Sequence, residues 1–180
     1  MTRYFGIGLR YVAIGLLLAT VGLAQDVSRM DEVVQYNVSN KKFMGSVLVA
    51  RSEEILLNKG YSSANLEWNI PNSPATKFRL GSVTKQFTAA AILLLEERGK
   101  LKTDDPVKKF MSDAPTTWEK ITIYHLLTHT SGIPNFTSFP DYPSQKAFAA
   151  TPEKLVARFR DKPLDFQPGE KWSYSNSGYI

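Results

Sequence analysis

The sequence predicts an α+β fold, in which two paired strands come first and a run of helices follows. The strands are expected at Gly45–Arg51 and Ile55–Tyr61, with a short turn between them. The longest apolar helical pattern comes after them, from about Val83 to Arg98. A doubly wound α/β sheet would instead alternate strands and helices along the chain, so that architecture is not expected.

The first 24 residues form a segment of their own. Two arginines are its only charged residues, an apolar run follows at residues 11–23, and small residues lead up to Ala24. This pattern predicts a secretory signal peptide that is cleaved after Ala24. An uncleaved membrane anchor is the alternative, but the run is shorter than the ~20 residues that a span needs. We therefore expect an exported protein, periplasmic or secreted, with its domain in residues 25–180.

The domain should begin with a helix at residues 26–36, ahead of the two strands. The first strand carries four apolar residues in succession, at positions 47–50, so both of its faces are apolar. Such a strand needs cover on both sides, and a lone hairpin is marginal in water. Further strands or helices are therefore expected to cover the hairpin.

The long helix should bury the apolar residues that recur at helical spacing, and Gly99 should end it. These residues are Val83, Phe87, Ala90, Ala91, Leu94 and Leu95. Shorter helices are predicted to begin at residues 103–106, at Thr122 and at Thr151. Residues 131–144 are rich in Pro, Gly, Ser and Asn, and are predicted to form a loop.

The composition excludes several functions. The chain has 180 residues with 22 Lys and Arg against 17 Asp and Glu, a formal charge of +5. The basic residues are scattered, so no nucleic-acid-binding surface is expected. No cysteine is present, which excludes disulfides, thiolate metal sites, a cysteine nucleophile and a lipid-anchored N-terminal cysteine.

Ser82 and Lys85 stand three residues apart at the start of the long helix, where both side chains would project from one face. The helix N-terminus beside Ser82 would favour a developing oxyanion. The spacing alone is weak evidence, because a second copy occurs at Ser39 and Lys42 without an apolar helix behind it. An ordinary N-cap serine with a solvated lysine is therefore the alternative at this stage.

Tyr174 and Asn176 follow a turn at Pro168-Gly169. A phenol can transfer protons when a nearby cation lowers its pKa, and an amide can orient a lysine or a substrate carbonyl. A polar turn with an aromatic anchor is the alternative. His125 and His129 are four residues apart and would share a helix face, but neither a glutamate after the first histidine nor a nearby third ligand supports zinc binding.

Taken together, three strings resemble the serine β-lactamase and penicillin-binding protein superfamily, specifically the class C β-lactamase-like serine hydrolases. They stand in the order and approximate spacing of that family, from about Phe43 to Ile180. The strings are FRLGSVTKQFTA at residues 78–89, HLLTHTSGI at 125–133, and Pro168-Gly169 leading into Tyr174-Ser175-Asn176.

The resemblance implies a β-lactamase/transpeptidase-like fold and a role for each matching residue. Ser82 would be the acylated nucleophile, Lys85 and Tyr174 would share the proton transfer, and Asn176 would orient the substrate. Which group is the acylation base is disputed in this superfamily. The backbone N–H of Ser82 would be one oxyanion donor, and no cofactor or metal is implied.

A third family motif, Lys-Thr-Gly or His-x-Gly on a later strand, has no match here, since Lys102-Thr103 is followed by Asp104 and precedes Tyr174. We therefore expect a truncated catalytic domain, with a strand hairpin and a helical part, that lacks the remaining sheet strands and the second oxyanion donor.

Three hypotheses follow from the missing motif. The chain is a poorly active fragment of a serine hydrolase, an inactive remnant that binds cell-wall peptides or ligands, or one half of a domain whose C-terminal half is encoded separately. The substrate would be a β-lactam, a D-Ala peptide, a D-amino-acid amide or an ester. Peripheral association with the cell wall is a further expectation.

Overall fold

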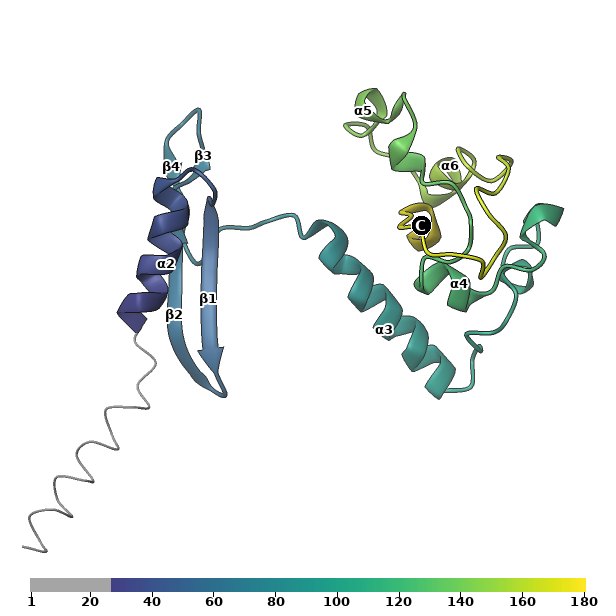
Figure 1. Cartoon of the computed structure of the whole chain (residues 1–180), viewed down its shortest axis with the longest axis horizontal. Coiled ribbons are helices and arrows are strands. Elements are labelled where there is room, and N and C mark those ends of the chain that lie inside the picture. Colours follow the sequence, from purple (N-terminus) through teal and green to yellow (C-terminus); the bar gives the residue numbers. More distant parts are fainter. Residues whose placement is uncertain (1–26) are drawn as a thin grey trace, which may run out of the picture. The chain divides into compact units, whose positions relative to one another are not determined.

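The computed structural model describes residues 27–180, and the predicted signal peptide and its cleavage site lie outside the described residues (Figure 1). The described chain divides into two units, residues 27–79 and residues 80–180. No helix within residues 27–180 has the length and apolar character needed to cross a membrane.

The first unit is a helix followed by two small antiparallel sheets (Figure 1). The β1–β2 pairing runs from Gly45 opposite Tyr61 to Arg51 opposite Glu54, with an irregularity after Val49. The second strand pair is short and was not predicted. The elements are α2 (Val27–Ser39), β1 (Gly45–Arg51), β2 (Glu54–Tyr61), β3 (Ser63–Asn65) and β4 (Ile70–Pro71).

A polar cluster ties α2 to β2. The Tyr61 hydroxyl donates to Asp31 at 2.6 Å, and the Lys59 ammonium donates to the same carboxylate at 3.0 Å. Burial and the Asp31 carboxylate raise the pKa of Tyr61 to about 12. Leu48 on β1 nevertheless stays 63% exposed, so residues 27–79 by themselves do not cover the hairpin on both faces as expected.

The second unit begins with the 3₁₀ turn η1 (Gly81–Val83), which leads directly into the long helix α3 (Thr84–Glu97). Short helices and 3₁₀ turns make up most of the remainder. The short α-helices are α4 (Ile123–Leu127), α5 (Tyr142–Gln145) and α6 (Pro152–Val156), and the turns are η2 (Val107–Lys109), η3 (Thr116–Trp118), η4 (Phe136–Ser138) and η5 (Ser177–Tyr179).

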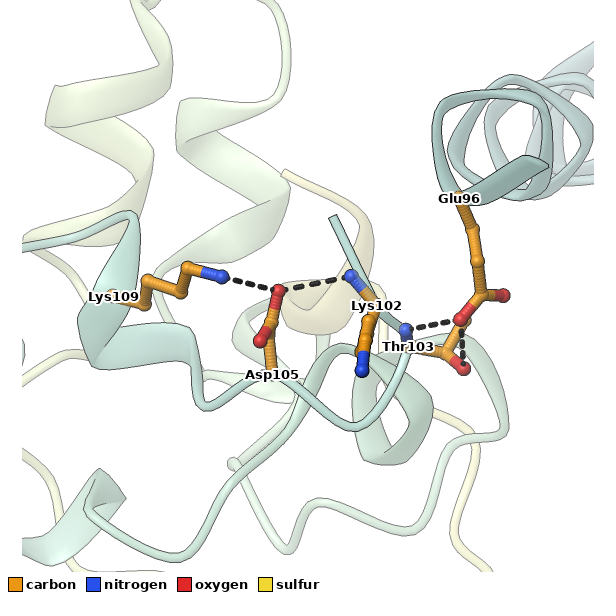
Figure 2. A network of polar contacts seen from close by, with 5 residues as sticks. All are labelled: Glu96, Lys102, Thr103, Asp105 and Lys109. Carbon is orange, nitrogen blue, oxygen red and sulfur yellow. Dashed lines mark hydrogen bonds and ion pairs between the residues drawn. The ribbon is translucent and has the colours of Figure 1, made fainter. Parts of the chain in front are cut away.

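The helices at Thr122 and Thr151 begin where predicted, since each threonine hydroxyl caps a helix, α4 or α6. The short helix expected from residues 103–106 is present only as the 3₁₀ turn η2, which follows Pro106, and the Asp105 carboxylate binds the Lys102 N–H and the Lys109 ammonium instead of capping it (Figure 2). The expected loop at residues 131–144 contains η4 and the start of α5.

The end of α3 is fixed to the segment that follows it. Glu96 accepts hydrogen bonds from the backbone N–H of Thr103 at 2.7 Å and from its hydroxyl at 3.0 Å (Figure 2). Gly99 follows the helix with a φ of +67°, a conformation that suits a helix-terminating glycine.

The predicted buried face of α3 is wrong for the described chain. Phe87 is 62% exposed and Leu94 is 43% exposed. The partly covered positions lie on another side of the helix and are Lys85, Ala89, Ile92 and Glu96. The apolar stripe stays open because no element of residues 80–180 packs on it, whereas the polar bonds of Lys85 and Glu96 hold their own side against the rest of the unit.

The core of the second unit lies among its short helices and turns. Trp118 and Phe136 each stack on Phe159, with ring centres 6.1 and 6.0 Å apart. Phe136 is 6% exposed and belongs to η4, so this core anchors η4 firmly. The buried cluster comprises Val107, Ala114, Trp118, Ile121, Ile133, Phe136 and Phe159.

Gly132 supplies the first prediction, because two chain segments meet there. Its φ is +77°, and an added Cβ would overlap the Phe166 carbonyl oxygen, a backbone atom that cannot rotate away. Gly132→Ala should therefore lower the unfolding free energy by more than the ~1–2 kcal/mol of left-handed strain alone. Chemical denaturation followed by tryptophan fluorescence measures this loss.

Gly99→Ala is the matched control, because Gly99 also has a positive φ but an added Cβ there has no atom within 4 Å. Gly99→Ala should lower the unfolding free energy only by the ~1–2 kcal/mol of left-handed backbone strain. Equal losses in the two variants would mean that the approach of Phe166 to Gly132 does not constrain the fold.

Candidate active site

Ser82 lies in η1, two residues before α3 begins, and Lys85 follows one turn later. The Lys85 ammonium donates a hydrogen bond to the Ser82 hydroxyl oxygen at 3.2 Å. Ser82 is exposed, whereas Lys85, in the first turn of α3, is half-buried. The Ser-x-x-Lys spacing therefore brings the two groups together on one face.

Lys85 contacts four side chains. Its ammonium also donates to the Asn176 carboxamide oxygen at 2.7 Å. It lies 5.0 Å from the centre of the Tyr174 ring and 5.4 Å from that of Tyr179, both within the range of cation–π attraction. The lysine thus joins α3 to a segment about 90 residues later in the chain.

Tyr174 completes a close pair with Ser82, because the two hydroxyl oxygens share a hydrogen bond at 2.6 Å. The pKa of Tyr174 is lowered below its ordinary value, first by the hydrogen bond of the Lys85 ammonium and second by the hydrogen bond of Ser82. A phenol in this position can exchange a proton with the serine directly.

Asn176 is engaged on both sides of its carboxamide. The oxygen accepts from Lys85, while the Nδ2 group donates to the Thr137 hydroxyl at 2.9 Å and to the Asn135 carboxamide oxygen at 3.3 Å. The structure thus brings together all four residues predicted from the sequence. In this arrangement the Asn176 amide orients Lys85.

His129 supports the segment that carries Tyr174. Its ring lies 4.5 Å from the Tyr174 ring, its Nδ1 accepts from the backbone N–H of Ser175 at 3.3 Å, and its carbonyl accepts from that of Ser173 at 2.9 Å. Burial, followed by the charge of Lys85, lowers the pKa of His129. The neutral ring therefore keeps its Nδ1 free of a proton, so that it can accept the hydrogen bond of the Ser175 backbone N–H.

The two histidines do not share a helix face, which corrects the prediction. His125 lies in α4 and forms a capping box with Thr122, whereas His129 lies beyond the helix end with a φ of +60°. The left-handed backbone turns its ring toward Tyr174 and Tyr179 instead. Within residues 27–180, no three metal-ligating side chains of His, Asp or Glu cluster together.

A cavity of about 500 Å³ opens beside this cluster. Ser82, Lys85 and Asn176 contribute polar groups to it, while Phe136 and Tyr142 contribute ring surface. The cavity is large enough for a small organic substrate or the end of a peptide.

A sequence model of the β-lactamase family matches residues 31–180 of this chain. The chain belongs to the β-lactamase family. Penicillin-binding protein 4* of Bacillus subtilis (strain 168) is 36% identical over 143 residues, which cover 77% of this chain and 31% of that protein.

Two solved structures of the superfamily are similar to the chain. A penicillin-binding protein from Bacillus halodurans aligns with a TM-score of 0.69 at 32% identity, covering 81% of this chain and 46% of that one. The D-amino acid amidase from Ochrobactrum anthropi SV3, complexed with D-phenylalanine, aligns with a TM-score of 0.60 at 29% identity, covering 74% and 37%. The predicted β-lactamase/transpeptidase-like α+β fold is thereby confirmed.

The chain spans about a third of the length of the curated relatives that it matches, since the first two are covered to 33% and 31%. It is a β-lactamase-family chain that contains the Ser-x-x-Lys and Tyr-x-Asn elements in contact with each other.

Sequence reasoning missed four residues of the site, namely His129, Asn135, Thr137 and Tyr179. His129 was considered as a metal ligand and as part of the string at residues 125–133, but was given no role beside Tyr174. Asn135 and Thr137 fall in the segment that was predicted to be a loop, so no helical or strand pattern indicated that they face the site. The one available signal was the adjacent Phe136, a large apolar residue in a polar stretch that needs a core position.

The lowered pKa of His129 gives a prediction about pH. As pH falls, the unfolded chain binds the proton near the ordinary value of ~6.5, before the folded chain does. The contribution of neutral His129 to the free energy of unfolding is therefore present above pH ~6.5 and is lost as the pH falls through the folded-state pKa of His129. NMR titration of the two histidines should give His129 a midpoint below the ordinary value.

His129→Asn is the matched variant, because asparagine tolerates a positive φ and does not titrate in this range. The denaturation midpoint of the unchanged chain should fall more steeply between about pH 7 and pH 5 than that of the variant. A midpoint of His129 at or above its ordinary value, or equal pH dependence in both chains, would contradict the assignment.

Proposed function

We propose that this chain is the Ser82-bearing part of a serine hydrolase that cleaves an amide or ester through an acyl-enzyme. The single observation that supports this most strongly is the 2.6 Å hydrogen bond between Ser82 and Tyr174, 92 positions apart. An ordinary N-cap serine would have no reason to meet a phenol whose pKa is lowered.

In this mechanism Tyr174 takes the proton of Ser82. The Ser82 oxygen attacks the carbonyl carbon while its proton passes to the phenolate oxygen of Tyr174. The same proton then goes from Tyr174 to the departing amine or alcohol, leaving Ser82 acylated. Water then attacks the acyl carbon and gives a proton to Tyr174, which returns it to the departing Ser82 oxygen. Lys85 stabilises the phenolate whenever Tyr174 is deprotonated.

The oxyanion would be stabilised by the backbone N–H of Ser82. The N–H groups of a first helical turn have no acceptor within the turn, so they can donate to developing negative charge. The long-range bonds of Lys85 hold η1 in place, which keeps this donor preorganised.

β-Lactams, D-Ala peptides, D-amino-acid amides and simple esters are the substrate classes that we propose. The names of the similar proteins, two penicillin-binding proteins and a D-amino acid amidase, support this range. We also propose that residues 1–24 direct export and that residues 25–180 belong to the hydrolase domain, which would bring the site to peptidoglycan in the periplasm or outside the cell.

Acylation of Ser82 is the direct test. A fluorescent penicillin and a fluorophosphonate should label the chain, and peptide mass spectrometry should place the adduct on Ser82. Ser82→Ala should abolish the label, and Tyr174→Phe should slow it by roughly 10²–10⁴, the usual contribution of general base catalysis.

Ser39→Ala is the matched control, because Ser39 belongs to the second Ser-x-x-Lys string and lies at the end of α2. Its labelling should equal that of the unchanged chain. Labelling that survives Ser82→Ala would contradict the proposal. Reversible binding of penicillin without an adduct would instead favour the inactive, ligand-binding alternative.

Turnover by this chain alone should be slow. Removal of one oxyanion donor typically lowers the rate about 10²–10³-fold. We propose that a second donor comes from the strand of the third family motif, which has no match in this sequence. The 62% exposed Phe87 and 63% exposed Leu48 also predict binding of a dye for apolar surface and a broad unfolding transition.

Co-expression with the C-terminal part of penicillin-binding protein 4* should raise the rate of cephalosporin or D-amino-acid anilide hydrolysis and sharpen unfolding. A sharp transition together with rapid, Ser82-dependent turnover by the chain alone would contradict this prediction.

A further inference from the structure

Asn135 and Thr137 contact Asn176 from the side opposite Lys85. We propose, on the basis of the serine hydrolase function above, that these two residues are positioning residues that determine which end of the Asn176 carboxamide faces Lys85. Within residues 27–180 no hydrogen bond joins either residue to Ser82 or Tyr174, so the proposed effect on the nucleophile passes through Asn176, although Thr137 also lines the cavity beside Ser82.

The orientation of the Asn135 carboxamide is set by backbone groups. Its oxygen accepts from the backbone N–H of Asn176 at 3.0 Å and from that of Thr137 at 3.4 Å. A backbone N–H can only donate, so a rotated carboxamide would put its own NH₂ group against two donors. In the observed orientation its Nδ2 donates to the Ser138 hydroxyl at 3.0 Å.

The Asn135 oxygen in turn sets the direction of the Thr137 hydroxyl. That hydroxyl donates its one hydrogen to the Asn135 oxygen at 3.0 Å. Its oxygen can then only accept, and it accepts from the Nδ2 group of Asn176 at 2.9 Å. The NH₂ end of Asn176 is therefore held on the side of η4.

The carboxamide oxygen of Asn176 is left to face Lys85, and it accepts from the ammonium at 2.7 Å. In the opposite orientation, the NH₂ group would face an ammonium that has only donors, and the Lys85 contact would be lost. The ammonium would then keep Ser82 as an acceptor but would lose its acceptor on the opposite side, which weakens its position beside the Tyr174 ring. The direction of two backbone N–H groups thus determines the geometry at the nucleophile.

The turn that carries Asn135 and Thr137 is held rigidly. Phe136 between them is buried in the core, and its backbone N–H donates to the Ser177 hydroxyl at 3.0 Å. The Ser177 hydroxyl donates onward to the Pro134 carbonyl at 2.6 Å. These two hydrogen bonds hold η4 against Ser177, the residue that follows Asn176. The relay, which is the series of hydrogen bonds from Asn135 through Thr137 to Asn176, therefore joins two fixed backbone segments.

Thr137→Val tests the relay, because valine keeps the shape of threonine without the hydroxyl, and Thr137→Ser keeps the hydroxyl without the methyl group. Thr117→Val is the control, since Thr117 is an exposed threonine at the middle of another 3₁₀ turn, η3. The rate of Ser82 labelling by the fluorescent penicillin and the NMR signals of the Asn176 NH₂ group are measured in each chain.

Thr137→Val should slow labelling roughly tenfold to hundredfold, because loss of the orientation of Asn176 would weaken its hydrogen bond with the charged Lys85. It should also shift the Asn176 NH₂ signals. Thr137→Ser should stay within a factor of about three and Thr117→Val should equal the unchanged chain. A packing role for Thr137 would give the reverse order, with serine worse than valine. Unchanged labelling and unchanged Asn176 signals in Thr137→Val would overturn the proposal.

A substitute variant and a second readout keep the test decisive. Thr137→Ala also lacks the hydroxyl and cannot overpack, so it replaces valine if the circular dichroism of Thr137→Val differs from that of the unchanged chain. If the unchanged chain is not labelled at Ser82, the proposed function fails by itself. The Asn176 signals then still decide whether Thr137 orients the carboxamide.

Discussion

The bonds of the Lys85 ammonium are the interaction on which the rest of the site depends. They join the start of α3 to Ser82 on one side and to Asn176 on the other, and two tyrosine rings flank the charge. Few other contacts hold α3, because its apolar stripe is exposed in residues 80–180. The side of the helix that is fixed is the polar one, where Lys85 and Glu96 bind at its two ends.

The positive charge of Lys85 also organises the protonation of its neighbours. It lowers the pKa of Tyr174 by stabilising the phenolate, and, after burial, it also lowers the pKa of His129 by opposing a second cation. The Lys85 charge therefore favours the phenolate form of Tyr174 next to the nucleophile and adds to the effect of burial in keeping His129 neutral. The neutral imidazole in turn accepts the Ser175 N–H, which keeps Tyr174 in contact with Ser82.

The strands and the main site residues could be predicted because each depends on local pattern or on spacing. Gly45–Arg51 contains a continuous apolar run at positions 47–50, and Ser82 and Lys85 meet because three residues make nearly one turn. The helix expected near Pro106 is only the 3₁₀ turn η2, and Asp105 binds the Lys102 N–H and the Lys109 ammonium instead of capping it (Figure 2). That choice depends on side-chain contacts that no helical periodicity contains.

The positions of Asn135 and Thr137 could not be derived for a related reason. Their role depends on the direction in which two backbone N–H groups point, and that direction exists only after Phe136 is buried and Ser177 clamps η4. A polar loop in the sequence therefore becomes a rigid part of the site through one apolar anchor. The same logic explains His129, whose positive φ turns it away from α4 and toward Tyr174. In both cases, the core and the backbone orient a polar side chain, and that side chain then orients the group beside the nucleophile.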